Sequence, residues 1–119
     1  MRALPLLLAL ACEPTIKTTT ITDEGTVCLN DAGEVEVTFP GCLSSSCDTL
    51  VSATCTAELI DGLVEVHGEA VIESQGNECT ADCGIIQATC ELPLIEDPDT
   101  ASFSYAGTET PLDAECVGF

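Results

Sequence analysis

The stretch that decides the fold is LVSATCTAELIDGLVEVHGEAVI, residues 50–72. Apolar and polar residues alternate on both sides of Asp61-Gly62, a pair that favours a two-residue hairpin turn. On one apolar face, the turn pairs Leu59 with Val64, Ala57 with Val66, Cys55 with Gly68, Ala53 with Ala70 and Val51 with Ile72. The other face pairs Glu58 with Glu65, Thr56 with His67 and Thr54 with Glu69. A slip of one residue would mix the two faces, so the pattern predicts this register.

Similar short runs lie on either side of this hairpin. Residues 26–30 and 34–39 alternate around a turn at 31–33, and residues 84–92, 101–107 and 112–119 give three more candidate strands. No segment has a convincing helical period. A chain of 119 residues allows one domain. We therefore expect an all-β, antiparallel β-sandwich of about seven strands over residues 25–119.

The last of these runs, ASFSYAG and PLDAEC, resembles the final hairpin of Ig-like bacterial surface domains. In those domains a strand that carries a Tyr leads into a turn at a Gly. The resemblance covers about 20 residues. It implies an Ig-like sandwich, with Tyr105 and Gly107 in these two positions.

Nine cysteines are too many for an ordinary domain of this size. Aromatic residues make up only 3% of the chain, so the core is thin and disulfides are expected to support it. An even set of eight follows the N-terminal segment: Cys28, Cys42, Cys47, Cys55, Cys79, Cys83, Cys90 and Cys116. Eight cysteines allow 105 pairings. We expect Cys28–Cys116 to join the first and last strands, and the other six to pair among themselves.

Six of the cysteines form a faint repeat. Both CLSSSCDTLVSATC, residues 42–55, and CTADCGIIQATC, residues 79–90, run from a cysteine pair through a strand to Ala-Thr-Cys. The repeat predicts equivalent disulfides on facing sheets. The second half also resembles small uncharacterised lipoproteins of myxobacterial type, a resemblance that implies no activity.

The N-terminal segment, MRALPLLLALAC, has the parts of an export signal. Arg2 is the positive residue, residues 4–10 are apolar, and Ala11 is the small residue before a cleavage site. The apolar run is too short to span a bilayer, and no later segment is long enough. An ordinary secretory signal, cleaved near Ala11 with Cys12 as a structural thiol, is one interpretation.

Residues 9–12, Ala-Leu-Ala-Cys, resemble the lipobox of bacterial lipoproteins, although the commonest form has Leu where Ala9 stands. The resemblance implies that residues 1–11 are a signal peptide and that Cys12 is acylated, with palmitate-type chains. It also implies contact with a membrane through this anchor alone, and a location in the cell envelope at the outer membrane. We interpret residues 12–24, which are rich in Thr, as a tether, part of which could pair at a sheet edge.

Twenty-one acidic residues against two basic ones give a net charge of −19, which becomes −20 if Arg2 is removed with the signal. Lys17 is then the only basic residue. Such a surface disfavours nucleic acid and anionic lipid, and it suits cations and basic partners. The chain has no Gly-rich phosphate loop and no basic stripe, so we expect no nucleotide cofactor.

Several side chains could bind metals or take part in chemistry. His67 shares a strand face with Glu65 and Glu69, which is either a weak metal site or a solvated face. Zinc could use Cys42/Cys47 and Cys79/Cys83, but thiolates need a reducing compartment. Calcium could use the oxygen-rich loops 22–25, 30–34 and 96–100, none of which is an EF-hand. Ser44, Ser45 and Ser46 have no evident base.

These observations predict a non-catalytic envelope lipoprotein with a structural or binding role. It would present an acidic β domain to an unknown envelope protein or polymer. The alternatives are a secreted inhibitor that offers a disulfide-closed loop such as CLSSSC to a protease, and a calcium-dependent binding module. A hydrolase that uses His67 is a further alternative.

Overall fold

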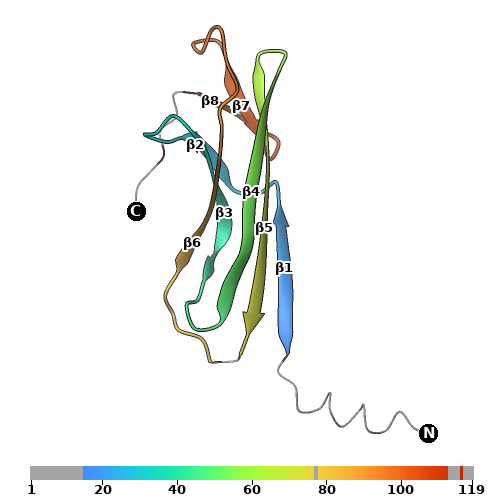
Figure 1. Ribbon diagram of the computed structural model, residues 1–119, viewed down its shortest axis with the longest axis vertical. Coiled ribbons are helices and arrows are strands. Elements are labelled where there is room, and N and C mark those ends of the chain that lie inside the picture. The colour runs from blue at the N-terminus through green and yellow to red at the C-terminus, as the bar shows by residue number, and fades with distance from the viewer. Residues whose placement is uncertain (1–14, 77, 113–115, 117–119) are drawn as a thin grey trace, which may run out of the picture.

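The computed structural model describes residues 15–76, 78–112 and 116 (Figure 1). Its strands are β1 Ile16–Thr22, β2 Thr26–Leu29, β3 Val35–Leu43, β4 Asp48–Ile60, β5 Leu63–Gln75, β6 Gly84–Cys90, β7 Ser102–Tyr105 and β8 Thr108–Pro111. Over the described ranges the chain forms no helix, and so none that is long and apolar enough to cross a membrane. The predicted all-β, disulfide-rich fold is confirmed, with eight strands instead of about seven.

The strands form two sheets. In the larger sheet β5 pairs with β4 along one side, and its other side is shared by two strands placed end to end. β1 lies antiparallel to residues 69–75 of β5, and β7 lies parallel to residues 63–65. β8 completes this sheet beside β7, while β2, β3 and β6 form the smaller sheet. The parallel pairing of β5 with β7 corrects the expectation of a wholly antiparallel fold.

The β4–β5 hairpin has the predicted register from the pair Leu59 and Val64, beside the turn, to the pair Ala53 and Ala70. Asp61 and Gly62 have φ angles of 51° and 81°, as a type I′ turn requires. One predicted pair is wrong: Ile72 lies opposite Leu50, not Val51. A β-bulge between Leu50 and Ser52 shifts the register by one residue, and Val51 is 52% exposed there.

The core lies between the two sheets. β5 contributes its alternating residues Val64, Val66, Ala70 and Ile72, and β7 contributes Phe103 and Tyr105. The smaller sheet faces them with Val27, Val35, Val37, Phe39, Ile86 and Ala88. No polar or charged residue is buried among the described residues. Most of these side chains are aliphatic and stabilise the fold by about 1.5–3 kcal/mol each, so the core is thin, as the composition predicts.

Both ends of the described chain differ from the sequence-based expectations. Residues 16–22 fall within the predicted tether, but they form the strand β1. They pair with β5, as the sequence allowed for part of this segment. The folded region therefore begins before Gly25. At the other end β8 comes before the strand expected over 112–119. Leu112 and Cys116 lie outside the strands, and the rest of that range falls outside the described residues.

Four disulfides join the eight cysteines that follow Cys12. Cys28 pairs with Cys116, the pair expected from the sequence, with their Cα atoms 5.1 Å apart. Cys55–Cys90 joins β4 to β6, and hence one sheet to the other. It closes 35 residues, which corresponds to about 4 kcal/mol on the chain-entropy account.

The two halves of the cysteine repeat are joined to each other. The first cysteine of one half pairs with the second of the other, in Cys42–Cys83 and Cys47–Cys79. The third cysteines pair as Cys55–Cys90. The expectation of equivalent disulfides on facing sheets is therefore wrong, because each of these three disulfides joins one half of the repeat to the other.

Candidate functional site

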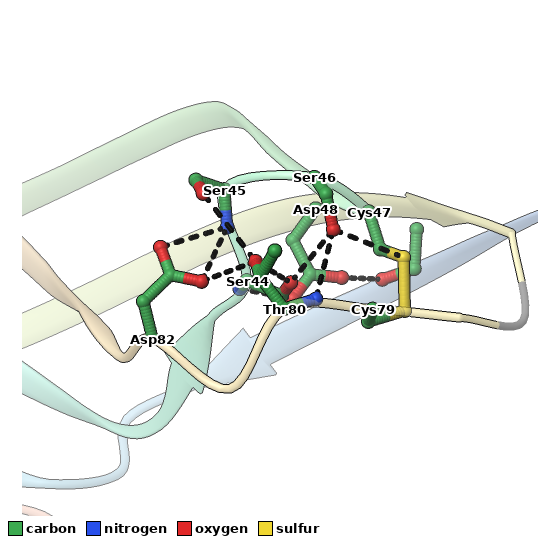
Figure 2. The surroundings of a disulfide bond; sticks show 9 residues. Ser44, Ser45, Ser46, Cys47, Asp48, Cys79, Thr80 and Asp82 are labelled. Atoms are coloured by element: carbon green, nitrogen blue, oxygen red, sulfur yellow. Dashed lines mark hydrogen bonds between the residues drawn. A yellow bond between two sulfur atoms is a disulfide. The ribbon is translucent and has the colours of Figure 1, made fainter.

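Two loops lie side by side at one end of the sandwich and form a double loop, defined here as residues 42–48 and 78–83. The first loop connects β3 to β4, and the second leads into β6 (Figure 2). Cys42–Cys83 and Cys47–Cys79 join them, with Cα separations of 4.7 and 5.5 Å. The motif CLSSSC is thus closed by a neighbouring loop, and not by a disulfide between its own two cysteines.

Hydrogen bonds brace the double loop between the two disulfides. The amide of Ser45 donates to the carboxylate of Asp82, at 3.2 and 3.4 Å from its two oxygens, and the amide of Thr80 donates to Ser46 Oγ at 2.9 Å. The hydroxyl of Thr80 donates to the same Asp82 and lies 3.0 Å from Ser44 Oγ. Ser45 and Ser46 are still exposed, so the double loop is an ordered surface.

Asp48 joins the double loop to β5. Its carboxylate accepts hydrogen bonds from Ser74 Oγ at 2.6 Å and from the amide of Ser44 at 2.7 Å. These two bonds hold the pKa of Asp48 below its ordinary value. Hydrogen bonds from Thr80 and Ser45 lower the pKa of Asp82 in the same way.

The strand that follows the N-terminal segment begins beside the double loop. Ile16, the first residue of β1, pairs with Gln75 and lines a groove of about 260 Å³ together with Ser45, Ser46 and Cys47. Figure 1 shows β1 rising from this end of the molecule, opposite the tip of the β4–β5 hairpin.

His67 lies on the outer face of β5, where the sequence analysis places it, with its side chain 64% exposed. Its Nδ1 is 3.3 Å from Asp23 Oδ2, and its Nε2 is 3.9 Å from Glu65 Oε1. The sequence pattern does not predict Asp23 as a neighbour of His67. Asp23 comes close to His67 because β1 pairs with β5. Its φ angle is positive, at 50°, a conformation that Asp adopts more readily than most residues.

The role of Asp23 is structural. Its amide donates to the carbonyl of Gly68 at 2.9 Å, and its Oδ1 accepts the amide of Gly68 at 2.9 Å. These two bonds fasten the point where the chain leaves β1 for the other sheet.

Tyr105 closes the same crossover from the core side. Its hydroxyl donates a 2.6 Å hydrogen bond to the carbonyl of Glu24. Burial, and then the negative charge of Asp23, raise the pKa of Tyr105 to about 12. A Cβ on Gly68 would lie 3.0 Å from this hydroxyl and 3.1 Å from Phe39 Cζ, so the position favours glycine.

The serines and the histidine lie far apart. Asp48 holds the serine loop against Ser74, which is seven residues from His67 along the same strand. At about 3.3 Å per residue this separation is about 23 Å. The structure therefore does not bring Ser44–Ser46 and His67 together for nucleophilic chemistry. A hydrolase in which His67 activates one of these serines is not supported by this geometry.

The expected metal ligands are not gathered either. Cys42, Cys47, Cys79 and Cys83 are all in disulfides, and a disulfide sulfur is not a thiolate that could bind zinc. Within the described ranges, three ligand atoms come within 4.8 Å of one another at Cys28, Glu36 and Cys116 alone, and both sulfurs there are in one disulfide.

Each of the three loops considered for calcium uses some of its oxygens in hydrogen bonds within the protein. Asn30 Oδ1 accepts the amides of Ala32 and Glu34 at 3.0 and 2.9 Å, and the carbonyl of Asp97 accepts the amide and hydroxyl of Thr100 at 3.3 and 3.2 Å. In the loop 22–25, Asp23 Oδ1 accepts the amide of Gly68.

A second groove lies at the opposite end of the sandwich and is called the distal groove here. It has a volume of about 360 Å³, and its lining is Leu59, Gly62, Leu94, Ile95, Glu96, Asp97, Thr100 and Ala101. The hairpin tip supplies one wall, and the loop between β6 and β7 supplies the other. Figure 1 shows these two segments at the same end of the molecule. The sequence pattern does not predict this groove.

Cys12, the predicted site of acylation, lies outside the described residues, as does the whole signal segment 1–11. The chain matches no protein-family model, no curated protein and no solved structure.

Proposed function

We propose that this protein is a non-catalytic lipoprotein of the cell envelope, which holds an acidic, disulfide-bonded β domain close to a membrane and presents it to a partner. One observation carries the proposal. The four disulfides use every cysteine except Cys12, so no cysteine of the same chain is left to pair with it. Cys12 also follows an apolar run and the lipobox-like residues 9–11.

The disulfides themselves support a location outside the cytoplasm, because disulfides persist in oxidising compartments. The Ig-like assignment belongs to this proposal. It is supported by the β7–β8 hairpin, in which Tyr105 leads into a turn at Ala106-Gly107, and by the Cys55–Cys90 link between the sheets.

The position of β1 gives the anchor a direction. Four residue steps separate Cys12 from Ile16, so at most about 14 Å of extended chain lies between a lipid on Cys12 and the start of β1. The double loop beside Ile16 would then face the membrane. The hairpin tip would point away from it, about 40 Å further along β5.

The mass of the intact protein tests the anchor. The protein is extracted from its native membrane fraction and alkylated before or after reduction. We expect a chain that begins at Cys12 with added acyl mass, and eight thiols that react only after reduction. The Cys12→Ser chain is the matched control, since it keeps all eight paired cysteines and should carry no lipid. A lipid-free wild-type mass would contradict the proposal.

The braced double loop favours one other function, that of a protease inhibitor. Inhibitory loops are ordered before they bind, and the disulfides and Asp82 order this one while Ser45 and Ser46 stay exposed. Incubation with a panel of serine and cysteine proteases tests this alternative. Inhibition that is lost when Ser45 and Ser46 are both replaced by Gly would support it, and no inhibition would remove it.

A further inference from the structure

We propose that the distal groove binds a cationic, amphipathic segment of a partner protein, in which an apolar side chain has Lys or Arg neighbours. The orientation of this surface rests on the proposed function, because a lipid on Cys12 would turn the groove away from the membrane. Its chemistry rests on the described residues alone.

Apolar side chains at and beside the distal groove are exposed to solvent and are not part of the buried core. Leu94 is 95% exposed, and Leu59 and Ile60 at the hairpin tip are each 41% exposed. Ile95, next to Leu94, packs against the core and so holds the base of the loop in place. Exposed apolar groups gathered around a hollow are typical of interaction sites.

The charges around this apolar surface are all negative. Glu96 and Asp97 line the groove, and Asp61 in the hairpin turn and Asp99 in the loop lie next to lining residues. Lys17, the one basic residue in the described part of the chain, pairs with Ser74 at the other end of β5. Eleven residues of strand, about 36 Å, separate Ser74 from Leu63 at the hairpin.

The exposed apolar side chains and the negative charges around them together indicate which kind of partner could bind here. A second copy of this chain would bring like charge against like, since its net charge is −19. An anionic lipid surface is disfavoured for the same reason. A segment with alternating apolar and basic side chains satisfies both features, because its apolar groups cover Leu59 and Leu94 while its cations meet Glu96 and Asp97.

The test uses the full chain with Cys12→Ser, so that its outcome does not depend on the lipid. The probe is the pentapeptide Lys-Leu-Lys-Leu-Lys with a neutral dye, and binding is followed by fluorescence anisotropy at low and moderate salt. Leu94→Ser should weaken binding by at least about tenfold, the lower end of what one buried leucine side chain contributes. Val51→Ser is the matched control, since Val51 is 52% exposed on the β4 bulge, and it should bind like the parent chain.

The charge contribution has its own variant. Glu96→Gln with Asp97→Asn should weaken binding at low salt and reduce its salt dependence, because two of the attracting charges are gone. A Lys-Ser-Lys-Ser-Lys peptide should bind more weakly than the leucine peptide. Three results would each overturn the proposal: equal affinity for the two peptides, an equal effect of Leu94→Ser and Val51→Ser, or a dimer of the chain that Leu94→Ser dissociates.

Discussion

Tyr105 bonds the crossover between the sheets from the core side. It is buried, it is the single tyrosine of a chain without tryptophan, and its hydroxyl is bonded to the carbonyl of Glu24. Its ionisation would place a negative charge in the core beside Asp23 and break that hydrogen bond. The folded state therefore favours the protonated phenol.

This gives a prediction for alkaline solution. The pKa of Tyr105 is raised to about 12 from an ordinary value of 10, so its contribution to stability is complete below pH 10 and is lost as the pH rises from 10 through 12. The absorbance of the phenolate should report a single titration, displaced above pH 10 in the folded protein. Unfolding in urea should return it to the ordinary value.

The Tyr105→Phe variant separates the hydrogen bond from the packing. Removal of the hydroxyl leaves the carbonyl of Glu24 without its partner and should cost about 1–2 kcal/mol at neutral pH, measured by urea unfolding. The difference in stability between the two proteins should shrink as the pH rises from 10 to 12. A difference that stays constant over this range would contradict the account.

At the scale of elements, Asp48 connects the first loop of the double loop to β5. Hydrogen bonds from Ser74 and Ser44 lower its pKa, so its contribution to stability is present above the ordinary carboxyl pKa near 4 and is lost as the pH falls through the lower, folded value. Asp48→Asn should therefore lower the melting temperature at pH 6 and have a smaller effect at pH 2.

Asp31→Asn, in an exposed turn, is a suitable comparison for Asp48→Asn because it removes the same charge from the surface. Both variants are melted over the same pH series. Asp48→Asn should lower the melting temperature at pH 6 by more than Asp31→Asn does, since it also loses the bonds to Ser74 and Ser44. Equal effects of the two variants at pH 6 would show that these bonds contribute nothing measurable.

The elements also show how far the sequence predicts the fold. The β4–β5 register follows from strict alternation around Asp61-Gly62, because a slipped register would bury Glu65 and expose Val64. The bulge does not follow, since Leu50 and Val51 are both apolar and the choice between them depends on packing. The exposed, Thr-rich residues of β1 carry no apolar face, so the sequence predicts a tether, part of which could pair at a sheet edge. Which edge it joins depends on the free side of β5.

The candidate sites were predicted less well than the strands. Cys28–Cys116 follows from its position at the ends of the domain, whereas the other three pairs depend on how two loops and two sheets meet in space. Asp23 beside His67 and the two walls of the distal groove are likewise contacts between distant segments. Local spacing in a sequence carries no information about such contacts.

At the scale of the whole molecule, the fold has two chemically different ends. The double loop and the start of β1 lie at one end, and the distal groove lies at the other, with the 13-residue strand β5 running between them. Two disulfides stiffen the first end, next to which the proposed anchor emerges. A domain anchored in this way should stand on the membrane with a fixed polarity.

Energy transfer to the membrane surface tests this polarity, because the chain has no tryptophan of its own. One variant carries Thr49→Trp, at an exposed position of β4 near the double loop, and the other carries Leu94→Trp at the distal groove. Each lipidated protein is placed in vesicles that contain a dye on the lipid headgroup. Transfer from the Trp at position 49 should be strong. Transfer from position 94 should be weak, because about 40 Å of β5 separates the two ends.

The Cys12→Ser forms should show no transfer at either position. Equal transfer from both tryptophans in the lipidated proteins would mean that the domain lies flat or tumbles freely, and the proposed presentation of the distal groove would then be wrong.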